Sequence, residues 1–257
     1  MRTSSFILPG VGPVTERRWW QETLFDWRTI LNRPSTAGPS ERSKLWYDGE
    51  LTERDTFIHM FDSRLPHRKQ WRLYEPCRSR VGYPDIETTG ASSESGEVTV
   101  VGFHHEGKTA TLVRGENLTA ERLQAELDHC TLLVTFFGLV FDVPYLCAKC
   151  PGLRFPTLHF DLCFAARRLA LRGELRYVEQ EMGIDRITPI SGLDGLDAVR
   201  LWFQWRRGST IARDILMSYN RAATENRVLH ADRFYRDMVS RFRPSSLSTT
   251  LQPAYSQ

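Results

Sequence analysis

The sequence has no apolar run of about eighteen residues, the length that a helix needs to cross a bilayer. The apolar stretch that follows residues 1–5 is too short for a secretory signal peptide. Cysteine is also scarce, and five cysteines with irregular spacing argue against a disulfide framework. These absences predict a soluble, cytoplasmic protein with no membrane partner.

The chain lacks a strong excess of charge of either sign, because 34 Lys and Arg residues stand against 31 Asp and Glu residues. The positive excess falls within residues 1–80, which hold 14 basic and 10 acidic residues, while the remainder holds 20 and 21. A modest excess of this kind is compatible with a polyanion partner, although scattered arginines are more often a solvated face. With 257 residues, 41% of them hydrophobic and 25% charged, the chain can bury a full globular core.

Two carboxylates stand out in the centre of the chain. Residues 83–90 read Tyr-Pro-Asp-Ile-Glu-Thr-Thr-Gly, and the alternation of a strand puts Asp85 and Glu87 on one face and Ile86 on the other. Like charges held this close repel each other, and burying them is costly unless a cation lies between them. The pattern predicts a metal-binding strand, and the alternative is an exposed strand edge with two solvated acids.

Two N-terminal features favour contact with nucleic acid. Gly10 and Gly12 form a Gly-x-Gly turn before a helix for which Thr15 is a candidate N-cap, and such a turn exposes backbone N–H groups that hold a phosphate. The alternative is a plain turn. Basic and aromatic residues follow over 65–72, where charge and stacking suit a nucleic-acid strand. The alternative there is a solvated helix that packs through Trp71.

The hydrophobic pattern predicts an α/β fold of ribonuclease H type, a mixed sheet with an antiparallel meander and parallel strands, flanked by helices. Strands are expected over 83–88, 97–104, 108–114, 132–136 and 158–161, and helices over 44–62, 119–128, 141–149, 197–205 and 213–239. A linker is expected over 34–43. The predicted organisation is a small helical segment over 1–80, the ribonuclease H-like domain over 81–243, and a disordered tail over 244–257.

Three motifs carry a resemblance to a known family. They are residues 85–90 (Asp-Ile-Glu-Thr-Thr-Gly), 134–144 (Val-Thr-Phe-Phe-Gly-Leu-Val-Phe-Asp-Val-Pro) and 219–221 (Tyr-Asn-Arg). They resemble the motifs of the YprB-type ribonuclease H-like family, which belongs to the DEDD superfamily of 3′–5′ exonucleases. The resemblance covers most of the chain, because residues 8–12, 71–74, 114–118 and 199–202 are also similar to that family.

The resemblance implies a metal-dependent nuclease acting on DNA or RNA, at a 3′ end or on a single strand. In that superfamily four carboxylates bind two Mg²⁺ or Mn²⁺ ions, and a tyrosine or histidine orients the attacking water. Carried onto this chain, the metal ligands would be Asp85, Glu87 and Asp142, and the water-orienting residue would be Tyr219. The residues implied to contact nucleic acid are Thr88, Gly138, Arg176 and Asn220, with Gly10 and Gly12 at the turn.

The fourth carboxylate is missing. The family pattern Tyr-Asn-x-x-Asp ends here in Ala223, and Glu225 does not replace it because two residues along a helix rotate a side chain by roughly 200°. Phe137 stands where the family has asparagine, and Pro84 removes a backbone donor from a strand expected to pair on both sides. We therefore expect weak or partial metal occupancy and reduced or lost activity. The alternative is a non-catalytic nucleic-acid-binding or scaffolding module.

A zinc site is disfavoured. Cys147, Cys150, His159 and Cys163 have the ligand types of a Cys₃His site, but a single Cys-x-x-Cys pair is a weak pattern. These residues are expected on a helix end and on a strand, which would have to bend to bring them together. Asp161, at a strand end, is expected to be a structural acid rather than a metal ligand.

Overall fold

The computed structural model describes residues 13–22, 65–171 and 192–242, and the chain divides into two compact units. The larger unit is Cys77–Arg236, and the smaller one combines Met1–Pro76 with Asp237–Gln257. Several sequence predictions lie outside the described residues, namely the linker over 34–43, the helix over 44–62, Gly10, Gly12, Arg176 and the tail over 244–257.

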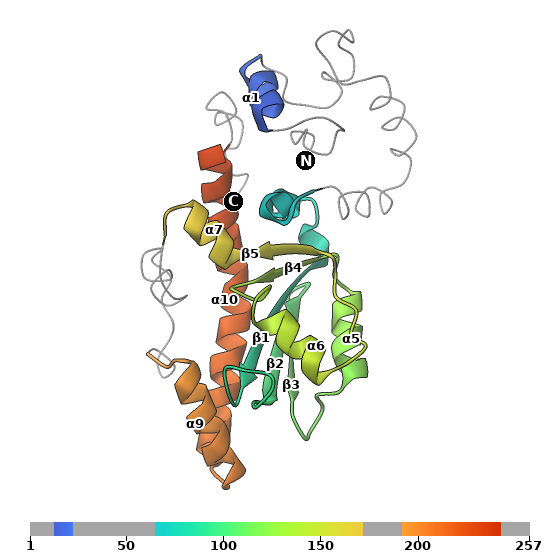
Figure 1. The fold of residues 1–257 in the computed structure, drawn as a ribbon. Coiled ribbons are helices and arrows are strands. Elements are labelled where there is room, and N and C mark those ends of the chain that lie inside the picture. The colour runs from blue at the N-terminus through green and yellow to red at the C-terminus, as the bar shows by residue number, and fades with distance from the viewer. Residues whose placement is uncertain (1–12, 23–64, 172–191, 243–257) are drawn as a thin grey trace, which may run out of the picture. The chain divides into compact units, whose positions relative to one another are not determined.

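A five-stranded mixed sheet forms the centre of the larger unit, in the order β3-β2-β1-β4-β5 (Figure 1). The strands are β1 (Val81–Thr88), β2 (Val98–His105), β3 (Lys108–Val113), β4 (Leu132–Thr135) and β5 (Leu158–Asp161). The first three form an antiparallel meander, while β4 is parallel to both β1 and β5. The predicted α/β architecture is confirmed, and the predicted strands are present with small shifts at their ends.

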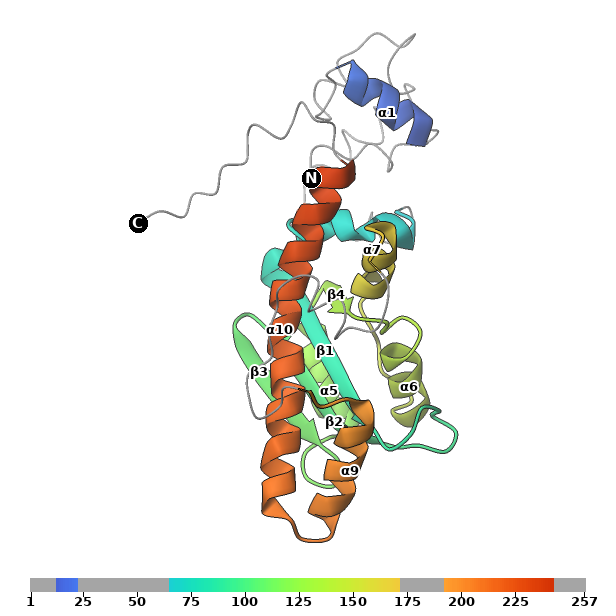
Figure 2. The ribbon, with the colours of Figure 1, turned by 90° about the vertical axis from the view of Figure 1, so that its left-hand side faces the viewer.

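Helices cover both faces of this sheet (Figures 1 and 2). They are α5 (Ala120–Asp128), α6 (Asp142–Lys149), α7 (Leu162–Arg168), α9 (Gly195–Arg206) and α10 (Thr210–Phe242). Neighbouring residues of β2 point to opposite faces, as strand geometry requires. Val101 lies in a hydrophobic cluster with residues of α5 and α6, whereas Val100 lies in a second cluster with residues of α9 and α10.

Strand β1 is central and pairs on both sides, as predicted, but its pairing with β4 does not reach Pro84. Pro84 lies opposite Phe103 of β2, but the parallel pairing of β1 with β4 involves only Val81 and Gly82. Pro84 therefore lies beyond the part of β1 that pairs with β4. Its missing N–H costs no hydrogen bond between these two strands. The part of β1 that carries the two carboxylates extends past its parallel neighbour.

The smaller unit contains α1 (Pro13–Gln21) and a 3₁₀ helix, η1 (His67–Leu73), and a second 3₁₀ helix, η2 (Arg78–Arg80), opens the larger unit. Thr15 is not an N-cap, because α1 begins at Pro13. Proline suits the first turn of a helix, where its fixed φ is helical and its missing N–H has no partner to lose. Trp71 is 5% exposed and its ring centroid lies 6.5 Å from that of Phe242, so this ring is packed rather than presented for stacking.

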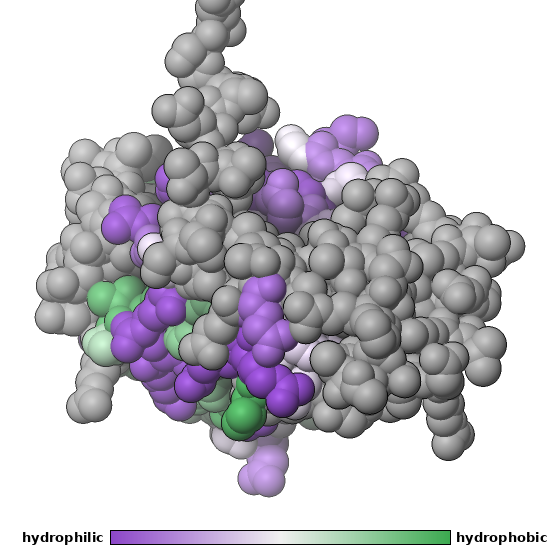
Figure 3. Space-filling model, turned by 90° about the horizontal axis from the view of Figure 1, so that it is seen from above, coloured by the Kyte–Doolittle hydropathy of each residue, from purple (hydrophilic) through white to green (hydrophobic). Residues whose placement is uncertain are grey.

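The surface of the described residues, seen from above, is mostly hydrophilic with small hydrophobic areas (Figure 3). Within residues 13–22, 65–171 and 192–242, no helix combines the length and the apolar character that a bilayer span requires. The exposed large hydrophobic side chains include Phe137 and Val140, in the turn between β4 and α6.

Candidate active site

Strand β1 places Asp85 and Glu87 on the same face of the sheet, as its alternation predicts. Ile86, between them, lies in the hydrophobic cluster on the other face. Glu87 is only 7% exposed and the side chain of Asp85 is 17% exposed, so the alternative of two solvated acids on an open edge is wrong. Two carboxylates in such surroundings need hydrogen-bond donors or a positive charge close by.

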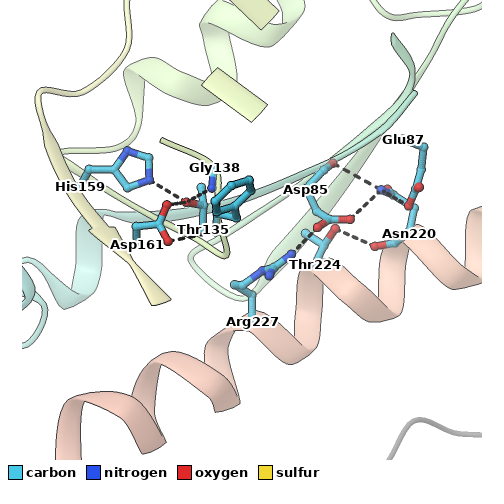
Figure 4. A network of polar contacts seen from close by, with 10 residues as sticks. Asp85, Glu87, Thr135, Gly138, His159, Asp161, Asn220, Thr224 and Arg227 are labelled. Carbon is cyan, nitrogen blue, oxygen red and sulfur yellow. Dashed lines mark hydrogen bonds and ion pairs between the residues drawn. The ribbon is translucent and has the colours of Figure 1, made fainter. Parts of the chain in front are cut away.

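Helix α10 supplies the donors because it packs very close to the sheet. Gly102 of β2 lies directly opposite Asp85 in the ladder, and a Cβ atom there would clash with Thr224 and come within 2.5 Å of Asn220 Oδ1. Asn220 Nδ2 lies 3.4 Å from both Asp85 Oδ2 and Glu87 Oε1, and 3.3 Å from the Asp85 carbonyl (Figure 4). The amide of Asn220 thereby links the two acidic side chains.

Arg227 supplies the positive charge. Its Nη2 donates to Asp85 Oδ1 in an ion pair, and only 2% of the arginine side chain is exposed (Figure 4). Its Nε and Nη1 are buried and have no hydrogen-bond partner among the described residues. The sequence prediction missed Arg227. The available signal was its spacing, because Asn220, Thr224 and Arg227 follow the i, i+4, i+7 rule for one face of a helix.

Asp142 belongs to the same centre through electrostatics. It is the first residue of α6 and is 7% exposed. Burial raises the pKa of Asp142 well above its usual range, and the negative charge of Asp85 raises it further. The guanidinium of Arg227 acts in the opposite direction and lowers this pKa. Asp142 therefore interacts electrostatically with both members of the Asp85–Arg227 pair.

Two other predicted residues on α10, Tyr219 and Ala223, are buried. Tyr219 is 9% exposed and belongs to the hydrophobic cluster that contains Val100, Trp202 and Leu216. Ala223, at the position of the missing carboxylate, is 5% exposed. The structure thus brings Asp85, Glu87 and Asn220 together, and it places the Tyr219 ring in a core.

Glu225 lies away from the two carboxylates of β1, as the helical rotation predicts. Its Oε1 accepts hydrogen bonds from Thr109 of edge strand β3, at 2.8 Å, and from Arg221, at 2.9 Å. These bonds lower the pKa of Glu225, while partial burial raises it. The carboxylate that follows Ala223 most closely in the sequence is therefore engaged elsewhere.

The turn between β4 and α6 is held by Asp161. Its carboxylate accepts the backbone N–H groups of Phe137 at 2.9 Å and Leu139 at 3.1 Å, and it caps α7 by accepting the N–H of Cys163 at 3.0 Å. Asp161 is a structural acid, as predicted. Phe137 has φ +66° and is 38% exposed, which places it in the left-handed region where asparagine is tolerated better than phenylalanine.

The remaining predicted contact residues take part in local bonds. Thr88 Oγ1 donates to the Gly90 carbonyl at 2.8 Å, beside the β1 carboxylates in the sequence. The N–H of Gly138 donates to Thr135 Oγ1 at 3.1 Å, and Thr135 Oγ1 also lies 2.7 Å from His159 Nε2 (Figure 4). These bonds lie at the end of β1 and at the turn between β4 and α6.

The residues of this centre do not fit a pair of divalent cations. Within the described part of the chain, no three His, Cys, Asp or Glu side chains are grouped so that they could hold a metal ion. A two-metal site holds its cations about 3.5–4 Å apart and needs carboxylates grouped around both of them. Here Ala223 contributes no ligand, and the cation beside Asp85 is the guanidinium of Arg227.

A family model agrees with the fold. A family model described as the RNase_H superfamily matches residues 83–232. Among solved structures, one described as the apo form of a nuclease has a TM-score of 0.48 and 17% identity, and it covers 67% of this chain and 80% of the other. Brucella melitensis NrnC, with and without bound Mg²⁺, has a TM-score of 0.48, 14% identity and the same coverage. No curated protein matches the chain.

Proposed function

This chain belongs to the RNase H superfamily, whose family model covers more than half of it, and we propose that it binds nucleic acid through a degenerate exonuclease-type centre. The motif resemblance favours descent from YprB-type DEDD 3′–5′ exonucleases. The observation that carries the proposal is the ion pair of Asp85 with Arg227. This arginine lies one helical turn beyond Ala223, which stands at the position of the family's fourth carboxylate.

The proposed loss of activity follows from the chemistry of phosphodiester hydrolysis. Divalent cations would activate the attacking water and neutralise charge on the leaving oxygen. A single guanidinium offsets one negative charge but does not lower the pKa of a bound water as a metal does. With Ala223 at the position of the fourth carboxylate and Arg227 paired with Asp85, the centre lacks a full set of ligands for the cations that would generate the nucleophile.

Nucleic acid remains the proposed partner, as DNA or RNA at a 3′ end or as a single strand. Thr88 ends strand β1 beside the carboxylates and Gly138 lies in the turn between β4 and α6, and the resemblance assigns both to substrate contact. Asn220 is fully buried, so its proposed role is to position Asp85 and Glu87. Arg176 and the Gly10–Gly12 turn are proposed phosphate contacts on residues outside the described part.

A second candidate function is a non-catalytic scaffolding module. The exposed apolar side chains of Phe137 and Val140, at 38% and 52%, favour it because they lie in the turn beside the centre. Exposed apolar side chains that lie together are a common feature of surfaces that bind another protein. The two candidates differ in whether the chain binds nucleic acid by itself.

One experiment tests the proposal. The full chain is incubated with 3′-labelled single-stranded DNA and RNA in Mn²⁺, beside Asp85→Ala and the matched surface variant Asp214→Ala. We expect the wild type and Asp214→Ala to bind an oligonucleotide and leave it intact. Digestion by the wild type that Asp85→Ala abolishes would overturn the loss of activity. Failure to bind either oligonucleotide would reject the nucleic-acid role and favour the scaffolding module.

A further inference from the structure

Arg227 is unlike the other arginines that the structure describes on helix α10. Arg221 and Arg236 are exposed and bond to groups of their own helix, and Arg213, whose side chain is 40% exposed, pairs with Glu116 and Asp214. Arg227 is 2% exposed and is directed at a carboxylate of the central sheet (Figure 4). Burying a guanidinium costs several kcal/mol unless negative charge surrounds it, so its position requires an energetic reason.

The surrounding carboxylates provide that reason. Asp85 is paired with the guanidinium, Glu87 is linked to Asp85 through Asn220, and Asp142 is buried within range of the charges of Asp85 and Arg227. Three acids in a poorly solvated region repel one another, and a cation among them removes most of that cost. The chain supplies this cation from its own sequence.

Ala223 and Arg227 are linked by helix geometry. Side chains of an α-helix lean toward its N-terminus, so a residue covers the surface of the preceding turn. Arg227 is four residues beyond Ala223 and therefore extends its side chain over that position. The methyl group of Ala223 leaves this space open, whereas an aspartate would compete for it.

We infer that the Arg227 guanidinium is the resident cation of this centre and takes the place of a divalent metal ion. The carboxylates are then held together without metal, and replacing the arginine leaves Asp85 and Glu87, on one face of β1, as ligands for a single divalent cation. The inference rests on the proposed function only in identifying these carboxylates with an exonuclease-type centre. It concerns cation binding and requires no nucleic acid.

The test measures Mn²⁺ binding to the full chain by electron paramagnetic resonance and by thermal unfolding. Arg227→Met removes the cation, Arg227→Lys retains one, and Arg236→Met removes a surface charge from the same helix. We expect Arg227→Met to bind Mn²⁺ at least about tenfold more tightly than the other proteins, because free carboxylates are the ligands that Mn²⁺ prefers. At ten times its Kd, Mn²⁺ should raise the unfolding temperature of this variant by about 3–6 °C.

Two results would overturn the inference. The first is that the wild type binds Mn²⁺ saturably and that Asp85→Asn abolishes this binding. The centre would then hold a metal ion while Arg227 is in place. The second is a folded Arg227→Met protein that binds Mn²⁺ no better than Arg227→Lys. If Arg227→Met does not fold without metal, its recovery on addition of Mn²⁺ supports the inference, and absence of recovery opposes it. Oligonucleotide binding is a separate measurement, so failure of the proposed function is recognised independently.

Discussion

The residue scale is dominated by one ion pair, between Asp85 and Arg227. Both partners are held by packing, since the arginine is 2% and the aspartate side chain 17% exposed. A buried ion pair contributes little net stability compared with apolar residues of the same volume, but removing one partner leaves an uncompensated charge. The cost of each single substitution should therefore exceed the cost of removing both.

A double-mutant cycle tests this pairing. We expect Asp85→Asn and Arg227→Met each to lower the free energy of unfolding in urea by about 3 kcal/mol, and the double variant to lose clearly less than the sum. The exposed i, i+4 pair of Arg221 and Glu225 is the control, for which a coupling of about 0.5 kcal/mol or less is expected. Additive losses at Asp85 and Arg227 would show that the two side chains do not depend on each other.

The sequence predicts the first half of this pair and not the second. The shared face of Asp85 and Glu87 follows from strand alternation, a local property. The arginine lies 142 residues further along the chain, and no spacing rule connects the two positions. The absence of a carboxylate at Ala223 can be read from the sequence, but the positive charge of Arg227 beside Asp85 becomes visible only when α10 is docked on the sheet.

The element that determines the centre is α10, which approaches the sheet at Gly102. This glycine lies opposite Asp85 in the β1–β2 ladder. The point at which α10 comes closest to β2 is therefore next to the Asp85 carboxylate. Thr224 Oγ1 donates to the Asn220 carbonyl at 2.7 Å. The buried hydroxyl group thus has a hydrogen-bond partner within α10 where the helix meets the sheet. Both side chains occupy the space that a Cβ atom on β2 would need.

Gly102→Ala tests the docking of this helix. The added methyl group would clash with Thr224 and Asn220, so we expect a loss of about 1–3 kcal/mol in the free energy of unfolding. Gly195→Ala is the control, because a Cβ atom there meets nothing within 4 Å and the residue begins helix α9. The control should be neutral or slightly stabilising. Equal stability of the two variants would contradict tight docking at Gly102.

The turn between β4 and α6 depends on Asp161, which binds two N–H groups of the turn and caps α7. We expect Asp161→Ala to lower the free energy of unfolding by about 2–3 kcal/mol, because it removes a cap and leaves partly buried donors unpaired. Asp194→Ala removes the exposed cap of α9 and should cost only about 1 kcal/mol. A smaller loss at Asp161 than at Asp194 would contradict its role in the turn.

Element boundaries show where sequence patterns reach their limit. The meander, α5, α6 and β5 follow from local alternation and helical periodicity, and the structure confirms them. The pairing of β1 with β4 stops after Gly82, which no local pattern specifies because strand register depends on tertiary packing. The left-handed backbone of Phe137 could not be predicted either, since phenylalanine is an unfavourable residue for that conformation.

At the scale of the whole molecule, the sheet of the larger unit is covered by two hydrophobic clusters, one on each face. Cys130 belongs to one of these clusters, and Cys77, at the start of the same unit, is 2% exposed. All five cysteines are free thiols. Their reactivity therefore reports how completely the larger unit excludes solvent.

Burial raises the pKa of the Cys77 thiol to about 11 and that of Cys130 to about 12, although Arg80 lowers both. The thiolate is the reactive form, so at pH 8 both residues should resist alkylation in the native protein. Cys147 is exposed and should react first. Mass spectrometry of peptides after timed iodoacetamide labelling measures the order, and urea-unfolded protein, in which all thiols react alike, is the control.

Because the two protected thiols lie in one unit, they should become reactive together as urea unfolds that unit. Early labelling of Cys130 alone would show that the hydrophobic cluster that contains Cys130 and residues of α5 opens independently of the rest.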